Sequence, residues 1–323
     1  MIFKEVLDPL MYHSVQHLTI SEEEAGQRLD NYLLRKLKGV PKSLIYRVIR
    51  KGEVRVNKGR AKPERKLQAG EVLRIPPLRL PEEKVQAAPG AGLIRVLESA
   101  ILLDRPDFLA INKPAGLAVH GGSGVNLGLI EALRAMWPQQ KYLELVHRLD
   151  RETSGCILVA KKRSALKYLQ GLFRGEKRIR KRYLALVKGQ WPKSEDRVNV
   201  PLLRIEQASG ERIVKVKAEG KAAITEFAIQ QYFPAGATLL TAEPVTGRTH
   251  QIRVHAQYLG HPIVGDDKYG DDASNTSMRT HGARRLFLHA ANLRFDDANG
   301  EPVDIQAPLP EDLQHVLDQL QSL

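Results

Sequence analysis

Residues 145–162 read LVHRLDRETSGCILVAKK. A strand-like run ends in HRLD, a polar loop follows Asp150, and a second apolar strand is predicted to begin at Cys156. An acidic side chain in a loop between two buried strands is held on a rigid scaffold while it faces a cleft. The cationic neighbours Arg148 and Arg151 favour the ionised form of Asp150. Asp150 is therefore a candidate nucleophile or general base, although a surface ion pair in a turn fits the same spacing.

The chain around this segment alternates short strands with short helices. Strand-like pieces include AILLD, FLAIN, RYLALVKG, TLLTAEPV and RLFLHAANLRF, and helical pieces are IEALRAMW, RSALKYLQGLFR and HQIRVHAQYLG. This mixture predicts a β-rich, mixed-sheet domain of the α+β class over residues 93–323.

A smaller unit precedes this domain. The segment GQRLDNYLLRKL places Leu29, Leu33 and Leu37 on one helical face, and VPKSLIYRVIRKG predicts a second helix that starts near Pro41 and stops at Gly52. The strand-like pieces EVRVN and EVLRIP follow. We expect a small α/β unit at residues 26–80, a loosely attached tail at residues 1–25, and a linker at residues 81–92 in a Pro/Ala/Gly-rich stretch.

The charge of the chain is concentrated in this small unit. The whole chain has a formal charge of +13, and residues 26–79 carry 16 Lys+Arg against 4 Asp+Glu, a net of +12. A solvated charged face is the alternative, but so high a concentration in so small a unit favours RNA binding. The residues expected to contact RNA are Arg28, Lys42, Ser43, Arg47, Arg50, Lys51, Arg55 and Asn57.

Composition also excludes several classes of protein. The only cysteine is Cys156, so no internal disulfide framework and no multi-cysteine zinc site is expected. No apolar run approaches the roughly 18 residues of a spanning helix, and the N-terminus does not resemble a signal peptide. We expect a cytoplasmic protein that binds nucleic acid, does not associate with membranes, and has no feature of an obligate oligomer.

A second informative stretch reads EPVTGRTHQIRVHAQYLGHPIVGDDKYG, residues 243–270. It predicts a turn at Gly247 and then a helix that contains Arg248, His250, Arg253 and His255. One interpretation is a metal site, as in a metal-dependent nuclease, from His250, His255, His261 and Asp266. A five-residue spacing does not place two imidazoles well on one helical face, and the arginines disfavour a dication. The other interpretation is an Arg-rich helix that pairs with a buried carboxylate and clamps phosphates.

Two further segments are weaker signals. Tyr183 lies on the strand of KRYLALVKG, where it is either an ordinary half-buried aromatic or a stacking platform for an unpaired base. The glycines at residues 112–124 give the backbone enough conformational freedom to pass close to a ligand. No Gly-Lys-Ser/Thr ends the segment, so it is not a P-loop.

These segments together resemble one family. VHRLDRETSG resembles the signature of the RluA-type pseudouridine synthases, whose catalytic aspartate is the one in HRLD, and RKRYLALVKG and VTGRTHQIRVH resemble that family's second and third motifs. Residues 25–60 resemble the S4 RNA-binding domain that precedes many of these enzymes. The resemblance covers roughly residues 20–320 and is strongest to members that act on large-subunit (23S) ribosomal RNA.

The resemblance implies an isomerase that flips a uridine out of RNA and reattaches the base through C5, without metal or cofactor. Asp150 would start cleavage of the N-glycosidic bond, Tyr183 would stack on the base and assist proton removal from C5, and Arg253 would pair with Asp150. Further substrate contacts would come from His147, Arg148, Leu149, Arg248 and Ile252, of which Arg148 would fill the space left by the base. A non-catalytic RNA-binding or ribosome-assembly factor is the alternative from another class.

Overall fold

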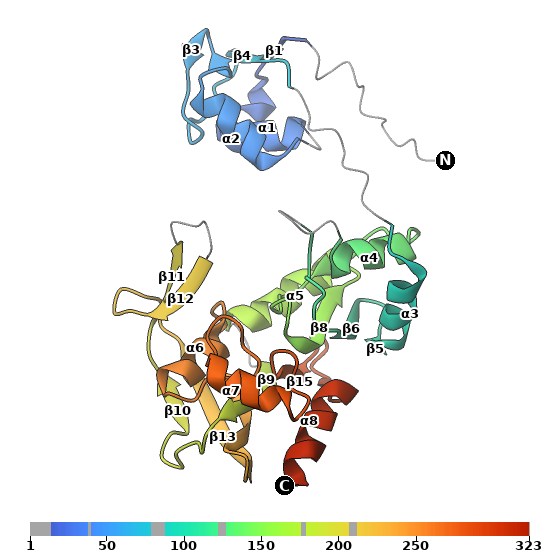
Figure 1. Cartoon of the computed structure of the whole chain (residues 1–323). Coiled ribbons are helices and arrows are strands. Elements are labelled where there is room, and N and C mark those ends of the chain that lie inside the picture. Colours follow the sequence, from blue (N-terminus) through green and yellow to red (C-terminus); the bar gives the residue numbers. More distant parts are fainter. Residues whose placement is uncertain are drawn as a thin grey trace. The chain divides into compact units, whose positions relative to one another are not determined.

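A computed structural model describes residues 14–37, 40–78, 88–121, 127–175, 179–206 and 212–322. The chain divides into two compact units, Met1–Val85 and Gln86–Leu323 (Figure 1). Parts of three predicted segments lie outside the described residues: the first part of the tail, most of the linker, and the Gly-rich loop from residue 122.

The N-terminal unit is a four-stranded antiparallel sheet, in the order β1-β4-β2-β3, with two helices. Its elements are β1 (Gln16–Thr19), α1 (Leu29–Lys36), α2 (Lys42–Arg50), β2 (Arg55–Val56), β3 (Gly59–Arg60) and β4 (Val72–Ile75). The apolar stripes predicted for both helices form its core, where Leu29 and Ile45 are fully buried. Gly52 has φ 72°, a left-handed conformation that suits the predicted helix stop.

The expected tail at residues 1–25 extends too far. Strand β1 pairs with β4 along its whole length, Ile20 is 1% exposed, and a 3₁₀ turn follows at Glu22–Glu24. Four residues of a strand at the edge of a sheet are too few to show a clear period, so the local pattern did not reveal the pairing.

The C-terminal unit is built on one large mixed sheet, which confirms the predicted α+β class. Ten strands belong to it, in the order β10-β13-β14-β9-β15-β8-β6-β5, with β16 paired to β15 and β7 to β8. Only the β15–β8 pair is parallel among the pairings described. The strands are β5 (Ile101–Asp104), β6 (Phe108–Lys113), β7 (Glu144–Leu145), β8 (Ser154–Ala160), β9 (Ile179–Lys188), β10 (Arg197–Asn199), β13 (Ile224–Phe233), β14 (Ala237–Pro244), β15 (Leu288–Asp296) and β16 (Pro302–Gln306).

Helices and a separate hairpin complete this unit. The hairpin is β11 (Leu202–Glu206) with β12 (Arg212–Val216). The helices are α3 (Ala91–Ser99), α4 (Leu129–Met136), α5 (Arg163–Arg174), α6 (Gln251–Tyr258), α7 (Asp272–Arg279) and α8 (Glu311–Gln321). None of the helices in the described part of the chain is long and apolar enough to cross a membrane.

Strand β8 is buried on both faces, which explains its uninterrupted apolar run. Cys156 and Leu158 lie in a cluster with apolar residues of α5, whereas Ile157 and Val159 lie in a cluster with residues of α3 and α4. Alternate side chains of a strand point to opposite faces, so the strand lies between two helical layers. The loop before β8 is thereby anchored to the best-packed part of the domain.

Three predicted boundaries need correction. The helix of the second motif begins at Gln251, so Arg248 and His250 precede it; His250 is its N-cap, with φ 54°. The strand before Asp150 is short, only Glu144–Leu145, and HRLD lies in the loop after it. The predicted linker is two residues too long, because α3 already begins at Ala91.

Candidate active site

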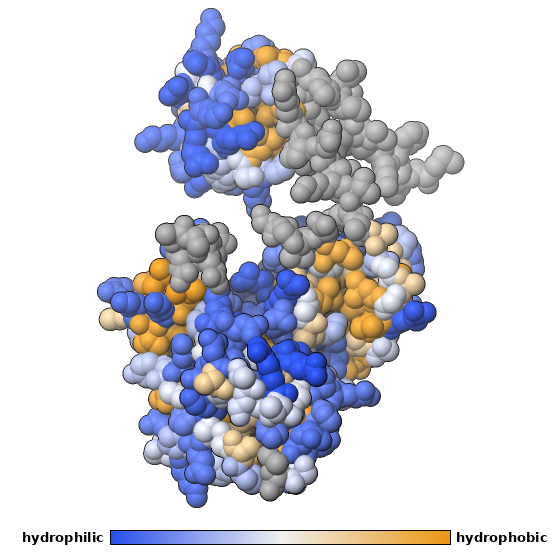
Figure 2. Space-filling view, viewed as in Figure 1, coloured by the Kyte–Doolittle hydropathy of each residue, from blue (hydrophilic) through white to orange (hydrophobic). Residues whose placement is uncertain are grey.

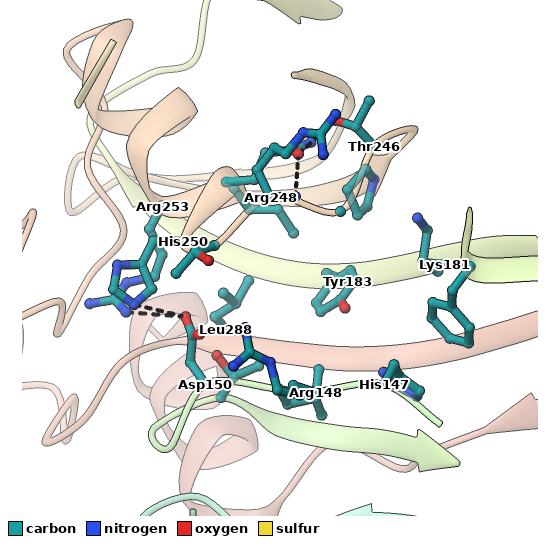
Figure 3. A pocket seen from close by; sticks show the side chains of 18 of the residues that line it. His147, Arg148, Asp150, Lys181, Tyr183, Thr246, Arg248, His250, Arg253 and Leu288 are labelled. Atoms are coloured by element: carbon teal, nitrogen blue, oxygen red, sulfur yellow. Dashed lines mark hydrogen bonds and ion pairs between the residues drawn. The ribbon is translucent and has the colours of Figure 1, made fainter. Parts of the chain in front are cut away.

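A cavity of about 400 Å³ lies where the loop before β8, strand β9 and the start of α6 meet (Figure 3). All eight residues predicted to act on the base or to contact the substrate line it: His147, Arg148, Leu149, Asp150, Tyr183, Arg248, Ile252 and Arg253. Leu149 and Ile252 are 7% and 6% exposed and supply apolar wall. The fold therefore brings together segments that lie far apart in the sequence.

Lys113 fixes the loop that carries Asp150. Its side chain is fully buried, and Nζ donates to the carbonyls of Pro114, Leu117 and Arg151 at 2.8, 2.9 and 3.0 Å. Burial lowers the pKa of Lys113 to about 7. Two more hydrogen bonds, both of 2.9 Å, join Gly116 to Arg151. The loop is thus tied to the turn after β6.

Gly155 determines how closely β8 can approach β15. It has φ 113°, and a Cβ at this position would lie 2.3–2.7 Å from the backbone of Ala290. Only glycine fits such a site, because the space and the dihedral angle both exclude a side chain. The glycine of the RETSG loop thus lets the sheet close directly behind Asp150.

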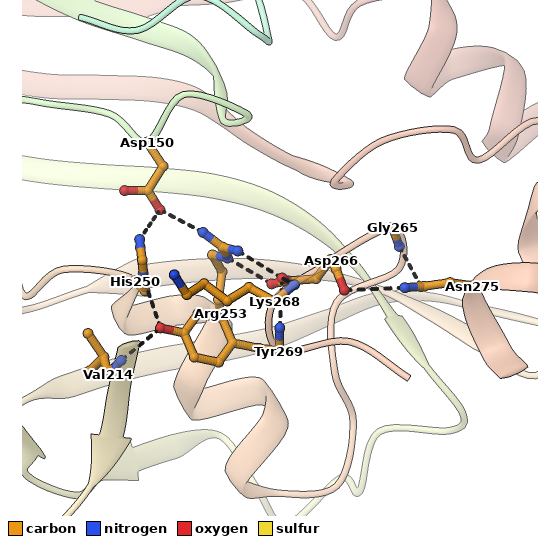
Figure 4. Close-up of polar contacts among 9 residues, drawn as sticks. All are labelled: Asp150, Val214, His250, Arg253, Gly265, Asp266, Lys268, Tyr269 and Asn275. Atoms are coloured by element: carbon orange, nitrogen blue, oxygen red, sulfur yellow. Dashed lines mark hydrogen bonds and ion pairs between the residues drawn. The ribbon is translucent and has the colours of Figure 1, made fainter. Parts of the chain in front are cut away.

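Arg253 is shared between two carboxylates (Figure 4). Its Nη1 donates to Asp150 Oδ2 at 3.2 Å, so the predicted pairing is present. Its Nε and Nη2 donate to the two oxygens of Asp266 at 2.7 and 2.8 Å. Burial opposes the charge on Arg253, but the bonds to Asp266 and Asp150 outweigh it and raise its pKa. Asp266 thus orients the guanidinium that contacts Asp150.

Asp266 is itself held by the backbone. Its Oδ1 accepts from the N–H groups of Lys268 and Tyr269, both at 2.9 Å. Burial alone would raise the pKa of Asp266, but the bonds from Arg253 and these N–H groups lower it. From its sequence context Asp266 is expected only in a possible metal site, although the carboxylate of the GDDKYG turn is a signal for this second role.

His250 also reaches the candidate nucleophile. Its Nε2 lies 3.8 Å from Asp150 Oδ2, and its Nδ1 is 2.7 Å from the hydroxyl of Tyr269, which accepts from the Val214 N–H at 2.9 Å. Burial lowers the pKa of His250 despite the nearby carboxylate of Asp150. The imidazole is therefore mainly neutral near pH 7 and can exchange a proton without carrying permanent charge.

Tyr183 lies on β9 on the pocket side. Its paired neighbours are Ala242 on β14 and Ala290 on β15, and these small residues leave space beside the ring. Burial raises the pKa of the Tyr183 hydroxyl, and the negative charge of Asp150 acts in the same direction. The phenol is therefore neutral near pH 7.

His147 lies at the other end of the pocket. Its Nε2 accepts from the Leu158 N–H at 3.1 Å, and its ring stacks on Phe173 with centroids 4.2 Å apart. Burial lowers the pKa of His147 to about 3. The side chain is thus a neutral wall of the pocket.

The residues of the metal-site interpretation point to other partners. His255 contacts the Thr225 hydroxyl at 2.9 Å, and His261 Nδ1 lies 2.8 Å from the carbonyl of Lys188. Within the described ranges, no group of three His, Cys, Asp or Glu side chains is placed to hold a metal ion.

The residues expected to contact RNA in the N-terminal unit are all exposed. Hydrophilic side chains cover much of the visible face of this unit (Figure 2). Arg28 also forms an ion pair of 2.7 Å with Asp30, and the Asn57 side chain accepts from the Val72 N–H at 2.8 Å. These two residues therefore have roles within the chain as well.

Comparison with known proteins agrees with this fold and pocket. The model of the RNA pseudouridylate synthase family matches residues 107–258, and that of the S4 domain matches residues 27–73. The chain belongs to the pseudouridine synthase family: it is an RNA uridine isomerase with an N-terminal S4 RNA-binding domain.

Curated relatives narrow the comparison further. The chain is 55% identical over 316 residues to ribosomal large subunit pseudouridine synthase C of Pasteurella multocida. The aligned residues cover 97% of this chain and 96% of that protein. It is 53% identical over 314 residues to the protein of the same name from Escherichia coli, and this alignment covers 96% of this chain and 98% of that protein. Among solved structures, human RNA pseudouridylate synthase domain containing 4 has a TM-score of 0.59 at 27% identity and covers 71% of this chain and 95% of that chain.

Proposed function

We propose that this protein isomerises specific uridines to pseudouridine in large-subunit (23S) ribosomal RNA, with Asp150 as the catalytic carboxylate. The observation that carries the proposal is the carboxylate of Asp150 on a pocket wall, 3.2 Å from an arginine that a buried aspartate orients. The names of the curated relatives support large-subunit ribosomal RNA as the substrate. Under this proposal the protein acts as a monomer in the cytoplasm.

The chemistry needs only groups of this chain. The target uridine leaves the RNA stack and enters the pocket, at an unstacking cost of a few kcal/mol. With Asp150 acting on the nucleotide, the N1–C1′ bond breaks and its electron pair stays on the uracil. The base turns, C5 bonds to C1′, the C5 proton is lost, and N1 takes up a proton. No redox change occurs, and no atom is added to the RNA apart from exchangeable protons.

The residues around Asp150 would divide this work. Arg253 would keep the carboxylate oriented, while Leu149 and Ile252 would enclose the base and Tyr183 would stack against it. Because the Tyr183 phenol is neutral near pH 7, its hydroxyl must pass on its own proton before it can accept one from C5. Arg148, exposed at the pocket, would occupy the space that the flipped base leaves.

Replacing Asp150 tests the proposal. Asp150→Asn removes the carboxylate with little change in shape, so single-turnover release of tritium from uridine labelled at C5 should be abolished. Affinity for a 23S RNA fragment should stay within a few-fold, because binding rests mainly on Lys and Arg. Glu152→Gln makes the same carboxylate-to-amide change at an exposed position of the same loop, so it is the matched control and should retain turnover.

Pseudouridine mapping of ribosomal RNA from a strain without this protein identifies the sites. Missing pseudouridines in large-subunit RNA are expected. If every site stays modified, the ribosomal substrate is wrong; appreciable turnover by folded Asp150→Asn would remove Asp150 from its role. Turnover that stops in excess chelator would favour a metal-dependent reaction instead.

A further inference from the structure

Three successive cations on β9 differ in how they are paired. Side chains alternate along a strand, so Arg180 and Arg182 share one face and Lys181 shares the other with Tyr183. On the first face Glu243 of the neighbouring strand β14 lies 3.7 Å from Arg180 and 3.1 Å from Arg182. The face with Lys181 is the one that lines the pocket.

Lys181 is largely buried, and the described residues give its ammonium no partner. Its residue is 9% exposed, yet it forms neither a hydrogen bond nor an ion pair with any residue in the described part of the chain. Burial lowers its pKa. Lys113 provides the contrast, since its buried ammonium donates to three carbonyls. A largely buried lysine whose ammonium has no acceptor costs folding free energy, and because Nζ still reaches the open pocket, a ligand there can complete it.

A second polar group in the same pocket also lacks a partner. Thr153 is 2% exposed, lines the cavity, and its hydroxyl is the one buried side-chain polar atom without a hydrogen bond among the residues described. The Thr153 hydroxyl has no accessible surface, so the group that can bind acceptor oxygens of an occupant is the Lys181 ammonium.

The place of Lys181 in the pocket narrows the choice of occupant. Figure 3 shows Asp150 and Arg253 at one end, Lys181 and His147 at the other, and Tyr183 between them. His147 is neutral, with a pKa of about 3, and stacks on Phe173. Lys181 is therefore the cation of its end of the pocket, about 7 Å along the strand from Tyr183.

We propose that Lys181 is an anion-binding residue of the pocket and donates to a negatively charged oxygen of the bound nucleotide. The inference rests on the proposed function. The oxygen has two possible sources: a phosphate of the RNA backbone, which is charged throughout the reaction, or O2 or O4 of the uracil, which becomes anionic once the N1–C1′ bond has broken.

Replacement of Lys181 separates these sources. Lys181→Met keeps the length of the side chain and removes the charge, and Lys181→Arg keeps the charge. The matched control is Lys188→Met on the same strand, where the ammonium is half-buried and paired with Asp271 at 3.1 Å. For each protein we would measure affinity for a 23S RNA fragment across a salt series, the single-turnover rate at saturating enzyme, and the midpoint of thermal unfolding.

Each source predicts a different result for Lys181→Met. A phosphate contact predicts affinity about ten-fold weaker, a salt slope smaller by about 1, and an unchanged single-turnover rate. A uracil contact predicts unchanged affinity and a rate lower by about 10²-fold, as when one donor to a developing anion is lost. Lys181→Arg should recover part of the lost function in either case.

The thermal unfolding midpoint distinguishes an anion-binding lysine from a structural one. Because Lys181→Met removes an unpaired charge from a largely buried side chain, its unfolding midpoint should equal or exceed that of the parent. A lower midpoint overturns the proposal, and so do affinity and rate both within two-fold of the parent. If the parent and Lys188→Met also fail to turn over, the proposed function is wrong, and the midpoint still decides whether Lys181 is a structural residue.

Discussion

Arg253 serves two carboxylates with one side chain, and this arrangement decides what its loss does. Asp266 is fully buried and has no other cation within the described contacts, whereas Asp150 is partly exposed to the pocket. The guanidinium therefore neutralises the buried charge of Asp266 and orients the carboxylate of Asp150, which we propose to be catalytic. Removing it affects stability and activity together.

Arg253→Ala should lower the free energy of unfolding by about 3–5 kcal/mol, because it leaves the Asp266 charge buried and uncompensated. Single-turnover activity should fall in the fraction that remains folded. Urea unfolding and tritium release measure the two effects. Arg248→Ala is the control, since Arg248 lines the same pocket but is exposed and bonds to the Ala222 carbonyl at 3.0 Å. Equal stability of the two variants would contradict the shared-pair account.

Two buried histidines predict loss of stability in acid. His255 and His289 have no exposed surface, and burial lowers the pKa of each from 6.5 to about 4. The unfolded chain binds protons at a higher pH than the folded chain does. Stability is therefore fully present above pH 6.5 and is lost as the pH falls toward 4, by on the order of 3 kcal/mol for each histidine.

Urea unfolding across this pH range measures the effect. His289→Gln should flatten the pH dependence, while His315→Gln, at an exposed position, should leave it unchanged. A free energy of unfolding that does not vary between about pH 7 and about pH 4.5 would show that these histidines do not control acid stability.

At the scale of elements, the junction of β8 and β15 holds the loop that carries Asp150. Here the sheet changes from antiparallel to parallel pairing, with His289 opposite Ser154 and Ala290 opposite Gly155. The Ser154 hydroxyl is 2.9 Å from His289 Nδ1, and His289 Nε2 donates to the Ala307 carbonyl at 3.1 Å. Because a carbonyl only accepts, Nε2 carries the proton in the neutral ring, and Nδ1 accepts from Ser154.

Gly155→Ala should destabilise this junction strongly. The added Cβ would meet the Ala290 backbone at 2.3–2.7 Å, so the strands must separate or the loop must shift, at a cost above about 2 kcal/mol and with loss of turnover. Gly175→Ala is the control: its φ is 91°, but nothing lies within 4 Å of the new atom, so only about 1 kcal/mol of backbone strain is expected. Thermal unfolding and turnover of the two variants check this difference.

At the scale of the whole molecule, charge and chemistry lie in different units. Nearly all of the excess of +13 belongs to residues 26–79, whereas every pocket residue lies in the unit Gln86–Leu323. We propose that the first unit holds RNA through phosphate contacts and that the second performs the reaction. Phosphate contacts position RNA without reading its bases.

Deleting residues 1–85 should weaken binding to ribosomal RNA and flatten its salt dependence, because fewer counterions are released. Single-turnover activity at saturating enzyme should remain measurable, since no pocket residue is removed. The experiment compares the two proteins across a salt series. An unchanged salt slope would exclude the RNA-holding role, and complete loss of turnover in a folded fragment would mean that the first unit helps to form the active site.

The sequence by itself determined the features that depend on neighbours along the chain. The helices of the S4 domain follow from leucine spacing, the strand after Asp150 follows from its apolar run, and the basic unit follows from composition. The HRLD, KRY and GRTHQIR segments identified the family because their residue types and order are specific. All of this information is local or additive, so it can be read without knowing the fold.

Only the tertiary structure decided which side chains contact one another in the pocket. Arg253 meets Asp150 across 103 positions of sequence, and Lys113 meets the Arg151 carbonyl across 38. The role of Asp266, and the absence of a partner for Lys181 among the described residues, depend on which strands pair and which faces they bury. Such contacts arise from sheet pairing between distant segments, and a local pattern carries no information about which distant side chain will complete a buried charge.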